Sequence, residues 1–287
     1  MPTAVGIEPI PLSPADVGGE WSTPTPIDAV NSPSNEQAPA LSPDGLTLYL
    51  TTNRNGNSDI YAARRACRVC PWGEPAPLPA PINTPMNDAA PFVSANGQLL
   101  FLNSNREGNV DLFVSRRLSN GDWDTPVRLG PGANTALGEN NAHYLQQPGD
   151  GYVEGPNVAG VLYYARAGVI VAVGLDRNQE VVGDAVLITE LNDPTAFAAA
   201  PTLSANGLEL IFHRSNPPDA PSPYFDLYIA TRRNIHDPWS APVNLGPVVN
   251  SDMEDLHGAL SLDGRTLIFA SSRGASAMQW DLWMTTR

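Results

Sequence analysis

Short runs of alternating apolar and polar residues recur along the chain, and turn sequences separate them. One such unit, PALSPDGLTLYLTTNRNGNSDIYAARR, begins at Pro39, and related units begin at Pro91, Pro201 and Gly258. Each unit holds three runs with the two-residue period of β-strands, and Asp-Gly or Asn-Gly separates the first two, which is a strong hairpin signal. A repeat of this length predicts an array of small sheets, since one such sheet cannot bury both of its faces alone.

A second phrase, built from Trp, Pro, an aliphatic residue and Asn, lies between the units. It occurs at residues 21–31, 72–83, 123–134 and 239–250, with a degraded copy at 182–192. It predicts a fourth, outer strand, where Pro is tolerated because an edge strand has no partner for the missing N–H. A degraded copy of the three-run unit also lies between the second and third clear ones, so both phrases occur five times.

The order of the two phrases predicts how the array closes. The chain opens with a fourth strand and ends with a third strand, so the N-terminal strand can complete the last sheet and remove two exposed edges. We therefore expect an all-β fold, a five-bladed β-propeller of four-stranded antiparallel blades, as a single domain over residues 21–287. Residues 1–20 are expected to form a flexible leader.

Charge and hydropathy restrict the partners. The net charge is −14, and all 16 basic residues are Arg. This balance argues against nucleic acid and anionic membrane surfaces, which require many basic residues. No run of about 18 apolar residues is present, so no membrane span is predicted. The first 20 residues lack the basic and apolar regions of a signal peptide, so this chain carries no targeting signal. We expect a monomer.

The two cysteines lie close together, as C-R-V-C at Cys67 and Cys70. A zinc ribbon needs a second cysteine pair, and a thioredoxin-type site needs a helix N-terminus, whereas the surrounding sequence is typical of a loop. A local disulfide is the favoured interpretation and would suit an oxidising compartment. Free thiols and metal or redox chemistry are the alternatives.

Several residue types recur once per blade and are interpreted as architecture. An Arg followed by an Asp is expected to tie the loop after the second strand to the third strand, and a Trp is expected to pack between blades. The Arg and Asp positions are Arg54 with Asp59, Arg106 with Asp111, Arg214 with Asp226, and Arg273 with Asp281. The Trp positions are Trp21, Trp72, Trp123 and Trp239.

A set of acidic residues precedes the innermost strands and is the candidate ligand site. Alignment on the turn serines places Glu36, Asp88 and Asp255 at one position, with Ala198 in the fourth blade and Glu139-Asn140 in the degraded blade. Such positions lie at one mouth of a propeller's channel. We therefore expect these side chains to converge on the axis. The alternative is that the acids hydrogen-bond the adjoining turn as part of the repeat.

Two histidines join this set. His257 follows Asp255 by two residues, and His143 begins the inner strand of the degraded blade. Carboxylates gathered closely need a cation or shifted pKa values, so a divalent cation is a candidate cofactor: Ca²⁺ with oxygen ligands, or a transition metal with His143, His257, Asp88 and Asp255. His213 is expected to be packed or in a loop, and His236 to lie on the surface.

The hairpin S-x-[DN]-G-x-x-[LI]-x-[FL], followed by N/S-R and D-[LI]-[YFW], resembles the WD-like propeller repeats of the TolB-like family. This resemblance implies an extracytoplasmic (periplasmic, cell-surface or secreted) propeller, and it does not imply one activity. The main functional expectation is a ligand-binding or interaction module for a small molecule, a saccharide or a protein, through an acidic, histidine-bearing channel mouth.

The third blade departs most from the repeat, and irregular positions are often functional. It contains V-E-G-P around Glu154, which resembles the acid-bearing segment of five-bladed glycoside hydrolases of the furanosidase type. That resemblance implies catalytic carboxylates from three blades, with Glu36, Asp88 and Glu139 or Glu154 as the candidates. The alternative function is therefore a saccharide hydrolase or lyase. The loop 146–160 is expected to be mobile and to gate the mouth.

Overall fold

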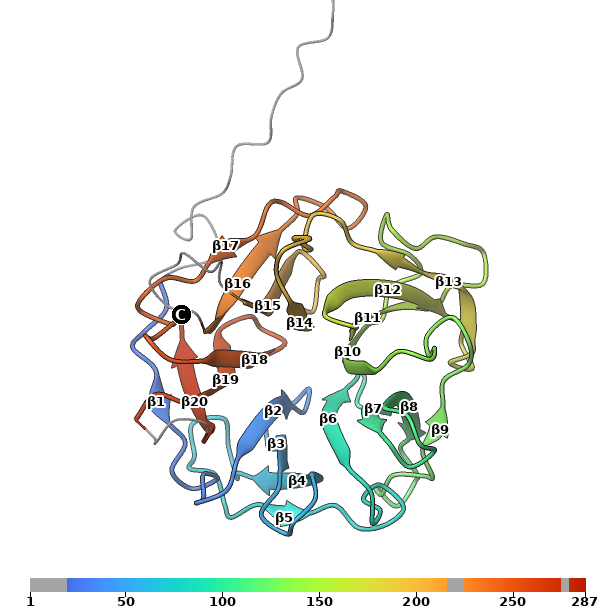
Figure 1. Cartoon of the computed structure of the whole chain (residues 1–287). Coiled ribbons are helices and arrows are strands. Elements are labelled where there is room, and N and C mark those ends of the chain that lie inside the picture. Colours follow the sequence, from blue (N-terminus) through green and yellow to red (C-terminus); the bar gives the residue numbers. More distant parts are fainter. Residues whose placement is uncertain (1–19, 216–223, 275–278) are drawn as a thin grey trace, which may run out of the picture.

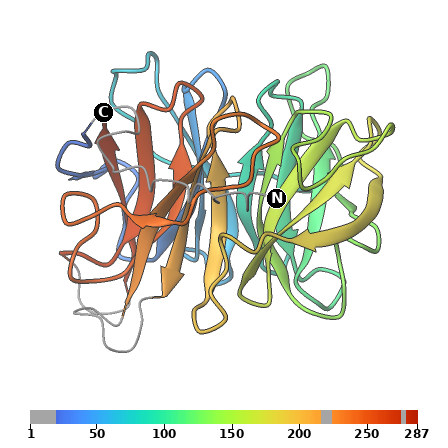
Figure 2. The ribbon, with the colours of Figure 1, turned by 90° about the horizontal axis from the view of Figure 1, so that it is seen from above.

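The computed structural model is a ring of five β-sheets around a central channel (Figure 1). It describes residues 20–215, 224–274 and 279–287. Each sheet has four antiparallel strands, and across the described residues no helix occurs. Viewed from above, the strands run through the thickness of the ring (Figure 2). The expected five-bladed, all-β propeller is therefore confirmed, while the leader proposed for residues 1–20 falls almost entirely outside the described ranges.

Each blade runs from an innermost strand at the channel to an outermost strand at the rim. The innermost strands are β2 (Glu36–Leu41), β6 (Asp88–Val93), β10 (Glu139–Leu145), β14 (Ala198–Leu203) and β18 (Asp255–Leu260). The second strands are β3 (Thr47–Thr52), β7 (Leu99–Ser104), β11 (Gly160–Arg166), β15 (Glu209–Ser215) and β19 (Thr266–Ser271). The third strands are β4 (Asp59–Arg64), β8 (Asp111–Arg116), β12 (Val169–Leu175), β16 (Phe225–Thr231) and β20 (Asp281–Thr286). The outermost strands are β5 (Ala76–Pro77), β9 (Val127–Arg128), β13 (Val181–Leu187), β17 (Val243–Asn244) and β1 (Thr25–Pro26).

The last blade contains strands from both ends of the chain. Strand β1 pairs antiparallel with β20, and Thr25 lies opposite Met284 in the register. The Ser22 N–H also donates to the Thr286 carbonyl at 2.8 Å. This arrangement is the closure expected from the order of the two phrases, and it leaves the third strand of the last blade with a partner on both sides.

The Ser-x-Asp/Asn-Gly turn has the same hydrogen bonds in four blades. In the first blade, the Ser42 hydroxyl donates to Asp44 at 2.6 Å and accepts from the Thr47 N–H at 2.8 Å. Gly45 has a φ of 72°, a conformation that Gly adopts without steric cost. The equivalent serines make the same two bonds in the second, fourth and fifth blades, at Ser94, Ser204 and Ser261.

The recurring Trp side chains pack between blades, as expected. Trp72, Trp123 and Trp239 are buried, and Trp21 packs as a partly buried residue against the core between the fourth and fifth blades. An Arg from the end of the third strand lies over each ring, with the Cζ atom 4.1 to 5.1 Å from the ring centroid. A stacked guanidinium adds a cation–π attraction to the packing.

Candidate functional site

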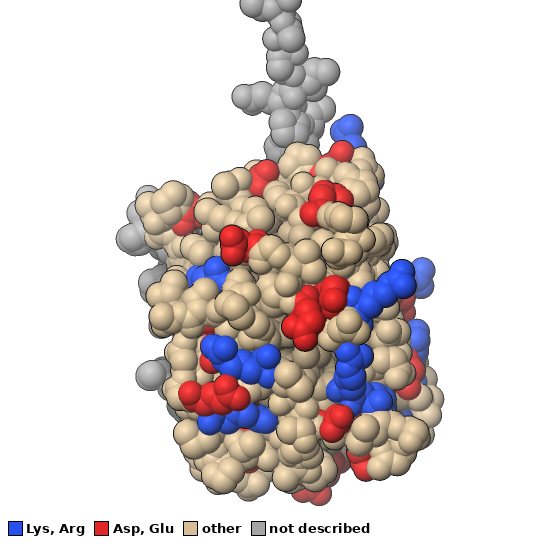
Figure 3. Space-filling view, turned by 90° about the vertical axis from the view of Figure 1, so that its right-hand side faces the viewer, with Lys and Arg blue, Asp and Glu red and all other residues tan. Residues whose placement is uncertain are grey.

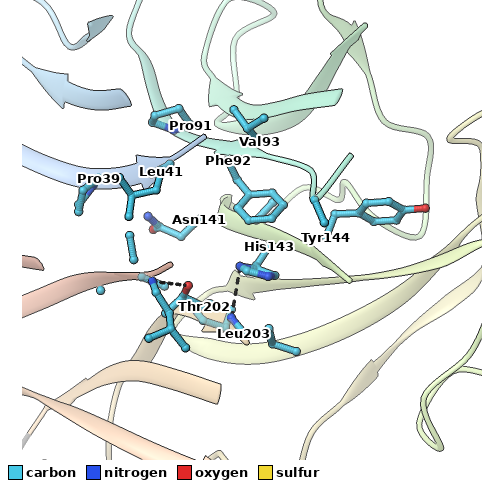
Figure 4. A pocket seen from close by; sticks show the side chains of 18 of the residues that line it. Pro39, Leu41, Pro91, Phe92, Val93, Asn141, His143, Tyr144, Thr202 and Leu203 are labelled. Carbon is cyan, nitrogen blue, oxygen red and sulfur yellow. Dashed lines mark hydrogen bonds between the residues drawn. The ribbon is translucent and has the colours of Figure 1, made fainter. Parts of the chain in front are cut away.

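The innermost strands enclose a cavity of about 430 Å³ on the axis of the ring. In every blade its lining begins at the third residue of the inner strand and continues into the turn that follows. The surface is mostly Ala, Pro, Leu and Val, with Phe92, His143, His257, Asn141 and Thr202 among the remaining side chains (Figure 4). None of the described residues that line it is an aspartate or glutamate. The cavity is therefore apolar, uncharged and bordered by a few hydrogen-bonding groups.

A β-bulge occurs at the same place in all five inner strands. The third residue of each strand has a φ between 45° and 54°, in the left-handed region that non-glycine residues seldom adopt, and the register with the second strand shifts just after it. These residues are Ala38, Ala90, Asn141, Ala200 and His257. The bulge turns this position toward the channel. Because three of the five are alanines, Asn141 and His257 contribute the polar groups of this layer.

His143 contributes a neutral imidazole to the cavity wall. It is 8% exposed, and its ring lies 4.0 Å from the Phe92 ring, centroid to centroid. The Leu203 N–H donates to Nδ1 of His143 at 3.3 Å (Figure 4), so the ring proton resides on Nε2 in this arrangement. Burial lowers the pKa of His143 to about 3. The side chain is thus an uncharged hydrogen-bond donor near neutral pH.

His257 is neutral for the same physical reason. Burial lowers its pKa to about 4, and its ring meets the His213 ring edge-on at 5.0 Å. The His257 N–H donates to Nδ1 of His213 at 3.2 Å. Burial, and then the nearby His257, place the pKa of His213 well below its ordinary value. His213 is buried as expected and does not line the cavity. Nδ1 of His257 is buried without a hydrogen-bond partner among the described residues.

The four aligned carboxylates lie at the starts of the inner strands, but they do not face the channel. All four side chains are fully buried, and each forms an ion pair with an Arg of its own blade. The pairs are Glu36 with Arg54 (2.8 Å), Asp88 with Arg106 (2.6 Å), Glu139 with Arg166 (3.1 Å) and Asp255 with Arg273 (2.5 Å). The expected acidic channel mouth is therefore wrong, because these charges are neutralised inside the protein. Asn140 is half-buried and lies outside the cavity lining.

The same carboxylates also accept hydrogen bonds from the residue four positions earlier. Asp88, for example, accepts from the N–H and the hydroxyl of Thr84 at 2.6 and 2.7 Å. The equivalent pairs are Glu36 with Ser32, Glu139 with Thr135, and Asp255 with Ser251. The alternative drawn from the sequence, that the acids bind the adjoining turn, describes this geometry.

This arrangement also corrects the expected partner of the recurring Arg. Arg54 binds Glu36, whereas Asp59 accepts from Nδ2 of Asn57 at 3.2 Å, and burial followed by the neighbouring Asp88 raises the pKa of Asp59. Arg106 and Arg273 bind their inner-strand carboxylates in the same way. In the fourth blade, where Ala198 replaces the carboxylate, the Arg214 guanidinium instead lies 4.1 Å from the Tyr228 ring centroid.

Glu154 lies on the surface, away from the cavity. Its side chain is 53% exposed, and one carboxylate oxygen is 3.0 Å from Nδ1 of His236, which is itself 63% exposed. The Gly151 N–H lowers the pKa of Glu154 most, followed by His236. The structure therefore does not bring Glu154 together with Glu36, Asp88 or Glu139 as a set of catalytic carboxylates. His236 is on the surface as expected.

The loop 146–160 is held by buried contacts. Asp150 is fully buried, accepts a hydrogen bond from the Tyr163 hydroxyl, and lies 3.8 Å from the buried Arg232 guanidinium. Val153 and Val158 pack into the hydrophobic core of the third and fourth blades. These contacts argue against the expected mobile gate, because opening this loop would expose an ion pair and apolar side chains.

No group of three or more His, Cys, Asp or Glu side chains in the described ranges is arranged to hold a metal ion. Of the proposed metal ligands, His143 and His257 line the cavity. Asp88 and Asp255 form ion pairs with Arg residues instead. The four residues therefore do not form a ligand set around one ion.

Three features outside the cavity are the disulfide, the distribution of surface charge and the lack of a membrane-spanning helix among the described residues. Cys67 and Cys70 form a disulfide in the loop between β4 and β5, as expected. Acidic and basic side chains are interspersed on the face shown in Figure 3, which has no continuous basic surface. None of the described segments forms a helix that is long and apolar enough to cross a membrane.

Comparison with known proteins supports the fold. No protein-family model matches the chain, and no curated protein matches it in sequence. An α-L-arabinofuranosidase from Podospora anserina, solved with cellotriose, is 15% identical, with a TM-score of 0.64 over 93% of this chain and 96% of the other. An exo-1,5-α-L-arabinanase from a bovine ruminal metagenomic library is 11% identical, with a TM-score of 0.61 over 89% and 93%.

Two further structures complete the comparison. A GH43 endo-arabinanase from Bacillus licheniformis is 14% identical, with a TM-score of 0.59 over 89% and 94%. TolB from Acinetobacter baumannii is 15% identical, with a TM-score of 0.49 over 90% of this chain and 56% of its own. With a TM-score below 0.5, the TolB match does not bear on the family of this chain. At these identities, the matches show a five-bladed propeller and do not assign a family.

Proposed function

We propose that this protein binds an uncharged saccharide in the central cavity and does not cleave it there. The observation that carries the proposal is the composition of the cavity: neutral hydrogen-bonding groups beside an aromatic ring, with no carboxylate among the described lining residues. Its volume of about 430 Å³ lies within the range of roughly 300–1,000 Å³ that is usual for small-ligand sites. A mono- or disaccharide matches this size and polarity.

The side chains supply the contacts that a sugar requires. Nε2 of His143 can donate to a ring hydroxyl, and Asn141 can both donate and accept. Phe92 offers an apolar face to the C–H face of a sugar ring. The Thr202 hydroxyl accepts from the Leu260 N–H at 3.3 Å and keeps its own proton for a ligand. Since the two cavity histidines are neutral, the site favours neutral ligands over anions.

The comparisons support a saccharide as the ligand. Several of the structures with this architecture are arabinanases or arabinofuranosidases, and their TM-scores exceed those of the TolB structures. They favour a carbohydrate-related role over the TolB-like interpretation. An extracytoplasmic location is part of this proposal, and the Cys67–Cys70 disulfide is consistent with an oxidising compartment.

Glycoside hydrolysis is the second candidate, and these same arabinan-active structures favour it. Hydrolysis needs a carboxylic acid and a carboxylate on either side of the scissile bond, about 5–9.5 Å apart. Glu36, Asp88 and Glu139 are buried in Arg pairs, and Glu154 is paired with His236 at the surface. The binding proposal therefore agrees better with the geometry.

A calorimetric titration with neutral arabino- and gluco-oligosaccharides tests the binding proposal. We expect saturable binding that Phe92→Ala and His143→Ala each weaken at least tenfold. Phe197→Leu serves as the matched control, because Phe197 is 44% exposed and does not line the cavity. Saccharide binding that is insensitive to both cavity variants, or no binding to any member of the panel, would overturn the proposal.

Product analysis separates binding from hydrolysis. The same oligosaccharides are incubated with the protein, and the products are resolved by chromatography. We expect no cleavage. Turnover that Glu154→Gln abolishes, in a protein that remains folded, would establish the second candidate in place of the first.

A further inference from the structure

A second cavity, of about 270 Å³, lies between the first and second blades and shares no lining residue with the central one. Its lining includes Tyr49 from β3, Arg64 from β4, and the segment after β5 that contains Pro79 and Pro81. The second blade contributes the connection between β8 and β9, with Arg117 and Trp123. We call this cavity the interblade groove.

The repeat shows what the Arg at the end of a third strand normally does. In the first blade, Nε of Arg65 donates to the Gly45 carbonyl at 2.8 Å, while the guanidinium lies over the Trp72 ring at 4.1 Å. The fourth and fifth blades repeat both contacts: Arg232 with Gly207 and Trp239, and Arg287 with Gly264 and Trp21. In these three blades, the Arg therefore contacts both the inner hairpin turn, through a hydrogen bond, and the outer Trp, through stacking.

Arg117 occupies the equivalent place in the second blade and departs from this rule. Its guanidinium is 5.1 Å from the Trp123 ring, farther than in the other three blades, and none of its hydrogen bonds goes to Gly97, the equivalent turn glycine within the described chain. The Arg117 side chain lines the interblade groove instead. A departure from a structural repeat indicates that the side chain serves a local purpose.

Arg64 and Arg117 both line the interblade groove. Tyr49 is buried, which raises its pKa, and the Arg117 guanidinium, then the Trp123 side chain and the Arg64 guanidinium, partly offset that rise. Two arginines from different blades thus line one groove.

This convergence is unusual in so acidic a chain. Acidic residues outnumber arginines by 30 to 16, yet across the described residues neither Arg64 nor Arg117 has a carboxylate within ion-pair distance. Asp122 also lines the groove, and its carboxylate accepts from Nδ2 of Asn120 at 2.7 Å. The Ser42 hydroxyl, and more weakly the Arg117 guanidinium, lower the pKa of Asp44, although Arg117 and Asp44 form no ion pair. The groove therefore offers two guanidinium groups that take part in no ion pair among the described residues.

We propose that the interblade groove binds a small organic carboxylate with a ring-sized body. Guanidinium groups match the planar geometry of a carboxylate and bind it with paired, charge-assisted hydrogen bonds. Trp123, Pro79 and Pro81 supply an apolar wall for the ring of the ligand. This site is separate from the central cavity, whose neutral lining suits uncharged ligands.

A ligand-observed NMR titration tests the site with benzoate, with benzamide as its uncharged analogue, and with inorganic phosphate. We expect benzoate to bind at least tenfold more tightly than benzamide or phosphate. Arg64→Gln and Arg117→Gln are each expected to weaken benzoate binding at least fivefold. Arg177→Gln is the matched control, because Arg177 is exposed in the turn after β12, away from the groove.

The exposed position of Arg64 keeps the test independent of folding, since Arg64→Gln removes no buried contact. Equal affinity for benzoate and benzamide would overturn the proposal, as would phosphate binding as tightly as benzoate. A loss in Arg177→Gln equal to that in Arg64→Gln would overturn it as well.

Discussion

The buried Asp88–Arg106 pair provides the sharpest test of the role assigned to the four inner-strand carboxylates. The Asp88 side chain is fully buried and accepts three hydrogen bonds of 2.6 to 2.7 Å, one from Arg106 and two from Thr84. Asp88→Asn replaces one carboxylate oxygen with an amide group that can only donate, so at least one of these donors loses its acceptor. Breaking a buried pair from one side costs about 3–5 kcal/mol.

We therefore expect Asp88→Asn to lower the free energy of unfolding by about 3 kcal/mol or more, as measured by urea denaturation followed by tryptophan fluorescence. Arg68→Gln is the control, because it removes a 3.4 Å ion pair with Asp263 in which both side chains are about half exposed. An exposed pair contributes about 1 kcal/mol or less. Saccharide binding by the folded fraction of Asp88→Asn should remain unchanged.

Two results would refute this reasoning. One is a loss of stability in Asp88→Asn no larger than that in Arg68→Gln. The other is a variant of native stability that no longer binds the saccharide. The first would mean that the ion pair contributes little to the fold, and the second would return Asp88 to the ligand site expected from the sequence.

Three further predictions concern other parts of the molecule. Asp150→Asn should lower the free energy of unfolding by about 3 kcal/mol, because it breaks the buried pair with Arg232. The same variant should make loop 146–160 newly sensitive to protease, and an unchanged digestion pattern would contradict this. Burial lowers the pKa of His143 to about 3, whereas an unfolded His titrates near about 6.5, so the unfolded chain takes up the proton first as the pH falls. The free energy of unfolding should therefore decrease below about pH 6.5, by at most about 5 kcal/mol at pH 3, and His143→Leu should show a smaller decrease in parallel urea titrations. Reducing the Cys67–Cys70 disulfide, which spans only a sequence separation of three residues, should cost about 2 kcal/mol by loop entropy and leave saccharide binding intact, as a titration in reducing buffer will show.

The fold could be predicted because the number and order of the repeated sequence phrases determine it. Five copies of two phrases fix the number of blades, and their order fixes the pairing of the N-terminal strand with β20. Hydrophobic alternation is a local property, and the turn sequences lie within a few residues of the strands that they connect. These features do not depend on knowing which side chains meet across the ring.

The site could be predicted only in part, because it depends on contacts between distant residues. The alignment of Glu36, Asp88, Glu139 and Asp255 is correct, but each Arg partner lies 18 to 27 residues away. The repeat pattern instead points to the nearer Asp as that partner. His143 and His257 do line the cavity. Asn141 and Phe92 line the cavity but are not predicted from the sequence, because a bulge changes which residues face the channel. The available sequence signal was the third position of each inner strand, which is Ala in three blades but Asn141 or His257 in the other two.

The shared last blade has a consequence for how the ligand cavity forms. Every blade contributes to the cavity wall, and the last blade is complete only when β1 has paired with β20. Synthesis from the ribosome delivers those two segments at very different times. Closure of the ring through β1 and β20 is therefore expected to follow the release of the last strand, and it completes the blade whose β18 lines the cavity.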